Sequence, residues 1–273
     1  MFLVLCWAIL LTASAHGQRL AILTPDNTPK DIAYAEELSA RFPSSVRVID
    51  RDQSDAAFRS VTLGNPFNMT SIEARSVAAV IGCDAFVVVH SSVLRRSALS
   101  RPTFFEAYAV HYLVDGRTGE LAAWKLKTFE NEVEQKAANE LLVSISHTAL
   151  ELSSAYPKRP AINDESVQIE TVPDEGTPAA ANLKTPIPYK RIKPAYTSMA
   201  FLYDVKATVE IEVDVGESGG ILATRIVRWA GYGLDESVDS TVRAMNWRPA
   251  MRGGKPLPMR VLLRYNFTKV DKD

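Results

Sequence analysis

Alternating apolar and polar side chains mark the carboxyl-terminal part of the chain most clearly. Residues 207–215 place Ala, Val and Ile between Thr, Glu and Asp, and residues 259–267 alternate in a similar way. This period of two is typical of half-buried strands. Between them, a Gly-Gly turn leads into a predicted strand over residues 221–229, and residues 234–245 repeat apolar side chains at helical spacing. The predicted order is strand, hairpin, strand, helix, strand.

Connection rules place these strands in one sheet. A right-handed crossover after the second strand brings residues 259–267 beside residues 207–215, antiparallel to them. The first strand is then central, and its Glu210 and Glu212 lie between two strands that both carry arginines. Opposite charges on neighbouring strands stabilise a sheet by roughly 0.2–1 kcal/mol per pair. The charge pattern therefore favours this topology.

The amino-terminal half mixes strand-like and helix-like stretches. Apolar runs and period-two patterns predict strands over residues 19–24, 46–49, 85–89, 104–114 and 121–126. Helical spacing predicts helices over residues 29–42, 50–61, 70–80 and 131–152. The basic residues 95–102 are interpreted as a loop or the end of a hairpin. The predicted fold class is α+β or α/β, with a mixed-sheet α/β domain followed by a small ββαβ domain.

Two stretches of distinct composition divide the chain. An apolar run with small residues after it predicts a signal peptide over residues 1–17, cleaved near His16 or Gln18. A retained membrane anchor is the alternative. A proline-rich stretch with few large apolar residues predicts an extended linker over residues 156–194. The linker separates a domain over residues 18–155 from one over residues 195–273, and we expect each domain to fold independently because no core joins them.

Composition and charge exclude several classes of protein. The net charge of −1 gives no reason to expect nucleic acid as a partner. Cys6 lies in the predicted signal peptide, so Cys83 has no partner for a disulfide in the mature chain. The pair Gly231 and Gly233 precedes a helix but lacks the remainder of a phosphate-binding fingerprint. We therefore expect no cofactor.

Three residues could in principle hold a metal ion. His90 and His111 fall on neighbouring predicted strands, and Cys83 precedes the first of these. The preferred interpretation is a strand-end histidine, a hairpin-face histidine and a buried thiol, so no metal site is predicted. His147 is expected to be solvated. The sequence contains no recognisable set of a nucleophile, a general base and a residue that orients the base. We therefore predict no catalytic residues.

Basic and aromatic side chains offer further alternatives. Arg95, Arg96 and Arg101 would suit an anionic partner, but a solvated loop is the preferred interpretation. Trp229, Trp247 and Tyr232 either fill the core of the carboxyl-terminal sheet or take part in binding a partner, because aromatic residues are enriched at interfaces.

A series of short motifs runs in order along residues 193–267. The motifs after the strand at 209–215 are Gly219-Gly220, Gly233-Leu234-Asp235, Trp247-Arg248-Pro249-Ala250, Gly254-Lys255-Pro256 and the closing strand to Phe267. This series resembles the TonB carboxyl-terminal domain family. The resemblance implies a periplasmic module for protein interaction, which in true transducers pairs its edge strand with a short receptor segment.

The amino-terminal half carries a second resemblance. Its motifs are Arg19-Leu20-Ala21-Ile22-Leu23, Val48-Ile49-Asp50-Arg51, Gly82-Cys83-Asp84 and Asp115-Gly116-Arg117-Thr118-Gly119. Together they resemble TolB amino-terminal and curli-secretion (CsgG-type) domains. Long pore-forming hairpins are not evident in the sequence, which favours a soluble periplasmic module over a secretion channel.

The function predicted from the sequence is therefore a non-enzymatic periplasmic protein that binds an envelope protein or peptide, with an outer-membrane receptor as one candidate. The last strand lies at the edge of its sheet, where a partner strand or a second copy of the chain can add. The predicted partner-binding residues are Arg260, Leu262, Arg264 and Asn266. A membrane-anchored energy transducer is the first alternative, and an envelope enzyme built on the α/β domain is the second.

Overall fold

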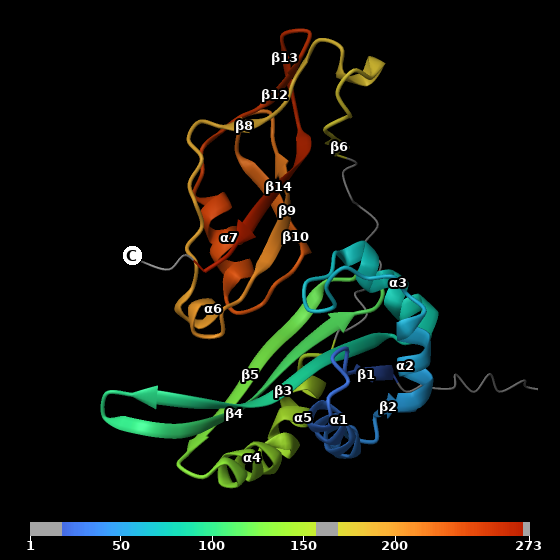
Figure 1. Ribbon diagram of the computed structural model, residues 1–273. Helices are drawn as coiled ribbons and strands as arrows, with labels where there is room; N and C mark the ends of the chain where they lie inside the picture. Colours follow the sequence, from blue (N-terminus) through green and yellow to red (C-terminus); the bar gives the residue numbers. More distant parts are fainter. Residues whose placement is uncertain (1–17, 157–168, 270–273) are drawn as a thin grey trace, which may run out of the picture.

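The computed structural model describes residues 18–156 and 169–269, which form two packed halves (Figure 1). The amino-terminal half contains a five-stranded sheet with the order β2-β1-β3-β4-β5. Its elements are β1 (Gln18–Leu23), α1 (Pro29–Arg41), β2 (Val46–Val48), α2 (Arg51–Arg59), α3 (Ser71–Ile81), β3 (Ala85–Ala98), β4 (Arg101–Asp115), β5 (Leu121–Asn131), α4 (Glu134–Val143) and α5 (Ile145–Ser154). The strands β2, β1 and β3 are parallel, and β4 and β5 continue the sheet antiparallel. The predicted mixed-sheet α/β domain is confirmed.

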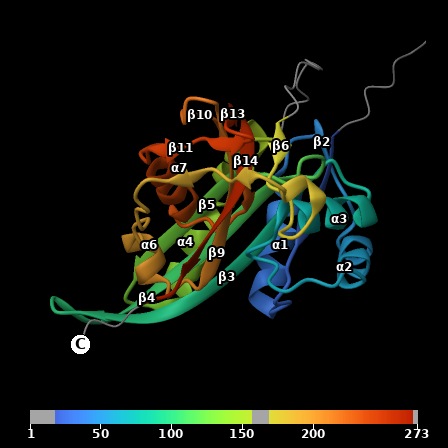
Figure 2. The same ribbon diagram turned by 90° about the horizontal axis from the view of Figure 1, so that it is seen from above.

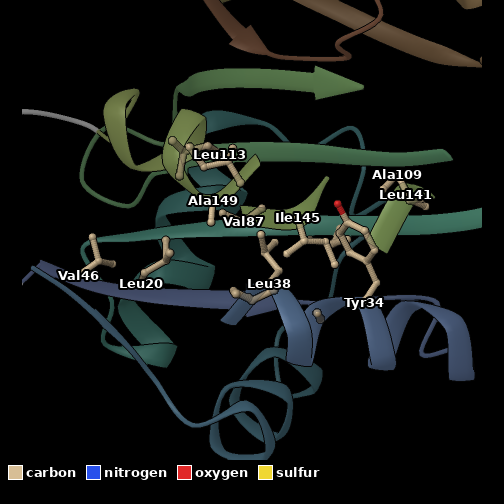
Figure 3. Close-up of a cluster of buried hydrophobic side chains, with 14 of the residues drawn as sticks. Leu20, Tyr34, Leu38, Val46, Val87, Ala109, Leu113, Leu141, Ile145 and Ala149 are labelled. Atoms are coloured by element: carbon tan, nitrogen blue, oxygen red, sulfur yellow. The ribbon is translucent and has the colours of Figure 1, made fainter. Parts of the chain in front are cut away.

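Apolar side chains cover both faces of this sheet. On one face, helices α1, α4 and α5 pack over the strands, and Leu20, Leu38, Val87 and Ile145 are among the buried side chains (Figure 3). The other face packs against α3 and against the carboxyl-terminal half. A strand that is buried on both sides has a continuous run of apolar residues, and residues 85–89 show this pattern.

Local signals account for where the helices begin and end. The Thr28 side chain caps α1 by accepting a hydrogen bond from the N–H of Asp31, and Pro29 occupies the first helical position. Thr70 and Glu73 form a capping box at the start of α3. Gly82 ends α3 in the left-handed conformation at φ 75°, which glycine adopts without strain.

The hairpin of β3 and β4 is longer than the sequence predicted. Its pairing continues to Ala98 and Arg101, so residues 95–102 form the end of the hairpin, the second of the two predicted alternatives, and the tip projects beyond α4 (Figure 1). Charged side chains in this region find partners on neighbouring strands: Arg96 lies 2.7 Å from Glu106, and Arg101 pairs with Glu130. These cross-strand pairs explain how a polar sequence continues a sheet.

The long helix predicted for residues 131–152 consists of two helices that meet at Ser144. The Ser144 hydroxyl donates to the carbonyl oxygen of Leu141 at 2.7 Å, a local bond that competes with the helical pattern. The apolar stripe is nevertheless continuous, because Ala137, Leu141 and Ile145 are all buried. The expected start was wrong, since Val133 is the amino-terminal cap and is exposed.

The carboxyl-terminal half is built around a four-stranded sheet with the order β10-β9-β14-β6. Its elements are β6 (Glu170–Thr171), β7 (Leu183–Lys184), β8 (Ile187–Pro188), α6 (Ser198–Leu202), β9 (Ala207–Val215), β10 (Ile221–Arg228), α7 (Leu234–Arg243), β11 (Trp247–Arg248), β12 (Ala250–Arg252), β13 (Lys255–Leu257) and β14 (Met259–Phe267). The strand β9 is central and β14 lies antiparallel beside it, so the predicted crossover is confirmed. Helix α7 packs on the apolar face, where Ile211, Val238 and Leu263 are buried.

The proline-rich stretch is in part integrated into this half. Strand β6 pairs parallel with the start of β14, β7 pairs with β12, and β8 pairs with β11. Glu170 on β6 accepts hydrogen bonds from both terminal nitrogens of Arg252 at 3.0 and 2.6 Å. The chain over residues 170–188 is therefore not a free linker. The remainder of that prediction includes residues 157–168, which lie outside the described residues, as does the predicted signal peptide over residues 1–17.

A buried contact joins the two halves, whose ribbons are seen from above in Figure 2. Trp229 follows β10 and is 0% exposed, packed with side chains of the amino-terminal sheet. Its ring N–H donates to the carbonyl oxygen of Gly119 at 3.3 Å, and the Asn68 side chain donates to the carbonyl oxygen of Trp229 at 2.6 Å. The expectation that no core joins the halves is therefore wrong. No helix in the described ranges has the length and apolar character to cross a membrane.

Candidate functional site

The outer edge of β14 is the site that the sequence predicts. Strand β6 covers only its first two residues, and the N–H of Val172 donates to the carbonyl oxygen of Arg260 at 3.0 Å. Since the N–H and C=O of a residue point to one side of a strand and alternate residues share that side, the backbone groups of Leu262, Arg264 and Asn266 face the same edge. Over the described residues, no strand pairs with this part of the edge. Its hydrogen-bonding groups are available to a partner strand.

The two arginines of the predicted site already have partners within the sheet. Arg260 donates two hydrogen bonds to Asp214, at 2.6 and 2.8 Å. Arg264 donates to Glu210 at 2.7 Å, although 63% of its side chain remains exposed. Hydrogen bonds and charge from Asp214 raise the pKa of Arg260. The arginines therefore stabilise β14 against β9, and their attraction for an external acidic group is reduced.

Leu262 and Asn266 complete the predicted site. Leu262 is 50% exposed on the polar face of the sheet, between the two arginine–carboxylate pairs. Asn266 accepts a hydrogen bond from the hydroxyl of Thr208 at 2.9 Å. An exposed leucine beside free backbone groups offers an apolar contact to a strand that adds at this edge.

Cys83, His90 and His111 do not come together. His111 pairs with Val89 across the β3–β4 ladder, and His90 lies one residue further along β3, so the two imidazoles are on opposite faces of the sheet. His111 is 0% exposed and lies 3.0 Å from the Tyr34 hydroxyl; burial lowers its pKa to about 4. Burial also raises the pKa of Cys83 to about 12. The three residues therefore do not form a common metal site, and His90 lies within β3 rather than at the strand end that the preferred interpretation expected.

The three aromatic residues singled out in the sequence have different surroundings. Trp247 is 3% exposed in the core of the carboxyl-terminal sheet, which confirms the core alternative for that residue. Trp229 is instead buried against the amino-terminal half. Tyr232 lies beside Trp124, with ring centroids 4.8 Å apart, and lines a cavity between the two halves.

That cavity, of about 350 Å³, is a second candidate site. Its walls carry aromatic rings from both halves, which follow one another at centroid distances of 5.2 to 6.0 Å. In order along the wall these rings belong to Phe67, His90, Tyr108, Tyr203 and Tyr232. Burial is the main cause that raises the pKa of Tyr232 to about 12, so its hydroxyl stays protonated at neutral pH.

Asp26, Asp31 and His90 form a polar group at this cavity. Nδ1 of His90 lies 3.0 Å from Oδ2 of Asp26 and 3.7 Å from Oδ1 of Asp31. Three such groups within 4.8 Å of one another would suit a metal ion. However, both oxygens of Asp31 already accept hydrogen bonds, one from Thr28 and one from Ser91, which leaves Asp31 a structural role in fastening α1 to β3. We therefore assign no metal to this group.

Sequence reasoning missed the cavity because its residues are far apart in the chain. Asp26 comes shortly after the apolar strand β1, and His90 follows the apolar run 85–89 within β3; these positions were the one available signal. Tyr203 and Tyr232 belong to the other half, and no local pattern shows that they face these residues.

Comparisons with known proteins support the resemblance of the carboxyl-terminal half. Residues 192–268 match the family model described as the Gram-negative bacterial TonB protein C-terminal. The TonB C-terminal domain of Pseudomonas aeruginosa is 18% identical, with 34% of this chain and 91% of that chain covered and a TM-score of 0.27. The comparison with curated protein sequences returned no match.

Two further solved structures share part of the chain. Lipoprotein GNA1162 from Neisseria meningitidis is 13% identical over 50% of this chain and 99% of that chain, with a TM-score of 0.33. The PelC dodecamer from Paraburkholderia phytofirmans is 10% identical over 53% of this chain and 91% of that chain, with a TM-score of 0.28. TM-scores this low carry no argument about function. The resemblance of residues 19–152 to TolB and CsgG-type domains stays a prediction.

Proposed function

Residues 192–268 form a TonB carboxyl-terminal domain, and from this premise we propose that the protein is a non-enzymatic envelope protein that binds a partner protein at the free edge of β14. The observation that carries the proposal is the row of backbone groups at Leu262, Arg264 and Asn266 that no strand of the described residues pairs with. An extended segment of the partner adds there as a strand, and its backbone provides most of the affinity.

Side chains on the same strand set the preference for a partner. Leu262 contacts an apolar side chain of the added segment, while the exposed part of Arg264 favours an acidic residue. The occupant is a segment of an envelope protein, with an outer-membrane receptor as one candidate and the same strand of a second copy as another. Strand β6 limits the open part of the edge to the residues after Arg260.

The proposed location is the periplasm, after cleavage of a signal peptide near His16 or Gln18. Amino-terminal sequencing of the protein from cell envelopes tests this proposal. A protein that retains Met1 and fractionates with the inner membrane would instead support the alternative of a membrane-anchored energy transducer.

Photo-crosslinking from within β14 tests the binding mode. A photoreactive amino acid in place of Leu262 is expected to crosslink to a partner in intact envelopes, whereas the same group in place of Leu222, which is 60% exposed on β10, is not. The substitution Leu262→Pro removes an edge N–H and should abolish partner capture, while Leu262→Ala keeps the N–H and should reduce capture only in part. If folded Leu262→Pro protein keeps its partner and its oligomeric state, strand addition at β14 is not the mode of binding.

A further inference from the structure

The cavity between the two halves lies beside the point in the amino-terminal sheet where the strand order reverses. Strand β1 lies between β2 and β3, and the chain leaves it through α1 on one face of the sheet and returns to β3 through α3 on the other. In open α/β sheets, ligands bind outside the carboxyl ends of the strands where the strand order reverses. Asp26 follows the end of β1, and His90 lies just beyond Val88, the last residue of β3 that pairs with β1. Both residues line the cavity at this reversal.

Aromatic rings of the carboxyl-terminal half line the other side of the cavity. Tyr203 stacks at a tilt on Tyr108, with centroids 5.2 Å apart, and Tyr232 lies 5.8 Å from Tyr203. Phe67 lies 6.0 Å from the imidazole of His90 on the amino-terminal side. A partly open cavity of about 350 Å³ with aromatic walls and a few polar groups has features of a small-molecule site.

The polar end of the cavity has an excess of negative charge. Asp26 is 48% exposed on its side chain and accepts no hydrogen bond from any described residue. Nδ1 of His90 lies 3.0 Å from it, but without the alignment of a hydrogen bond. Behind them, Asp31 is fully buried and no Lys or Arg of the described chain pairs with it. Two carboxylates therefore converge on one imidazole.

We propose that this cavity binds a small organic amine, with the ammonium group on Asp26 and the apolar part of the molecule among the aromatic rings. The ammonium supplies the hydrogen-bond donors that Asp26 lacks and balances the buried charge of Asp31. Aromatic faces also attract cations, which favours an amine over a neutral ligand of the same shape. The proposal does not depend on the edge of β14.

Lys206 is the one cation among the lining residues, and it would favour an anionic ligand instead. It is exposed and makes no ion pair within the described part of the chain, so it is not within 4.0 Å of Asp26. Asp26 therefore favours a positively charged ligand and Lys206 a negatively charged one. Probes of the same shape that carry positive, neutral and negative groups distinguish these two preferences.

Calorimetric titration of the full chain with three probes tests the proposal. The probes are 2-phenylethylamine, 2-phenylethanol and 3-phenylpropionate, which share one aromatic body and carry a positive, a neutral and a negative group. We expect the amine to bind most tightly and the carboxylate least. Asp26→Asn should weaken binding of the amine by about tenfold, the range of one hydrogen bond to a charged group, and leave the alcohol unchanged.

Two further variants control the result. Asp52→Asn removes a carboxylate that is 91% exposed on α2 and should change nothing. Val205→Phe places a ring in the cavity and should abolish binding of all probes, provided that its thermal melt shows a folded protein. The proposal is overturned if the carboxylate binds more tightly than the amine, if Asp26→Asn does not weaken the amine, or if no amine binding is detected at millimolar concentration.

Discussion

Two titratable side chains, the buried His111 and the half-buried Asp235, shift the stability of the protein with pH in opposite directions. Burial lowers the pKa of His111 from 6.5 to about 4. As pH falls below 6.5 the unfolded chain takes up a proton at this site and the folded chain does not. The contribution of His111 to stability is therefore present above 6.5 and declines by about 1.4 kcal/mol per pH unit as pH falls toward 4.

Asp235 acts in the opposite direction. Burial raises its pKa from 3.8 to about 7, although the N–H groups of Gly231 and Ala230 both donate to its carboxyl group and lower the pKa. The folded chain keeps the proton on Asp235 while the unfolded chain releases it. The stability contribution of Asp235 is present below pH 4 and declines as pH rises toward 7.

Between pH 4 and 6.5 these two effects nearly cancel, and single substitutions should reveal each one. Relative to the unsubstituted protein, Asp235→Asn is expected to give stability that rises with pH, by about 1.4 kcal/mol per unit, and His111→Gln stability that falls by a similar amount. Urea unfolding at several pH values in this range measures the slopes. Variants whose profiles run parallel to that of the unsubstituted protein would contradict the assignment.

At the scale of elements, the turn between β4 and β5 depends on one glycine. Gly119 has φ 74°, and a Cβ there would lie 2.0 Å from the carbonyl oxygen of Ser71. Its own carbonyl oxygen accepts the ring N–H of Trp229. Gly119→Ala should therefore lower the free energy of unfolding by at least about 3 kcal/mol.

Gly176→Ala is the matched control for this turn. Gly176 also has a positive φ, 81°, but nothing lies within 4 Å of a Cβ at that position. Backbone strain alone should cost about 1–2 kcal/mol there. Equal losses of stability in the two variants, measured by urea unfolding, would show that the contact with Ser71 contributes nothing.

The two arginines of β14 should differ in what they contribute to the sheet. Arg260 holds Asp214, which is 6% exposed, and Arg260→Glu would leave that carboxylate unpaired, at a cost of about 2–3 kcal/mol. Arg264→Glu should cost less than about 1 kcal/mol, because Arg264 is largely exposed and Glu210 keeps Arg228 at 3.5 Å. Urea midpoints compare the two variants. Arg264→Glu is therefore the substitution that changes the charge of the edge while the fold is kept.

At the scale of the whole molecule, Asn68 fastens one half to the other. It is 6% exposed, donates to the carbonyl oxygens of Thr208 and Trp229 and accepts from the N–H of Thr208 at 2.9 Å. A side chain so deeply buried is not accessible for modification in the folded protein, although its sequence forms a glycosylation sequon. The same contacts explain why the two halves should unfold together.

Asn68→Ala should lower the free energy of unfolding by about 2–4 kcal/mol, because it leaves the backbone groups of Thr208 and Trp229 that Asn68 bonds without a partner. Asn65→Ala is the control, since the side chain of Asn65 bonds only to the nearby N–H of Phe67 among its described contacts. Calorimetry of the full chain should show one transition in the unsubstituted protein and separated transitions after Asn68→Ala. Two separated transitions already present in the unsubstituted protein would show that the halves unfold independently.

Sequence patterns alone determined the three long strands, the helix α7 and their topology in the carboxyl-terminal half, but not the short elements α6, β6–β8 and β11–β13. The alternation in β9 and β14, the helical stripe of α7 and the crossover rule sufficed, because period and connection length are properties of the chain itself. The open edge of β14 followed from the same reasoning, except for the part that β6 covers.

Only the tertiary structure decided which buried faces meet. The period of a strand shows that one face is buried and does not show what covers it. The burial of Trp229 against the amino-terminal sheet, the pairing of β6 with β14 and the cavity between Asp26 and Tyr232 all join residues distant in sequence. Each depends on how the two halves pack, which is set by the shapes and charges of complete surfaces and by no single stretch of sequence.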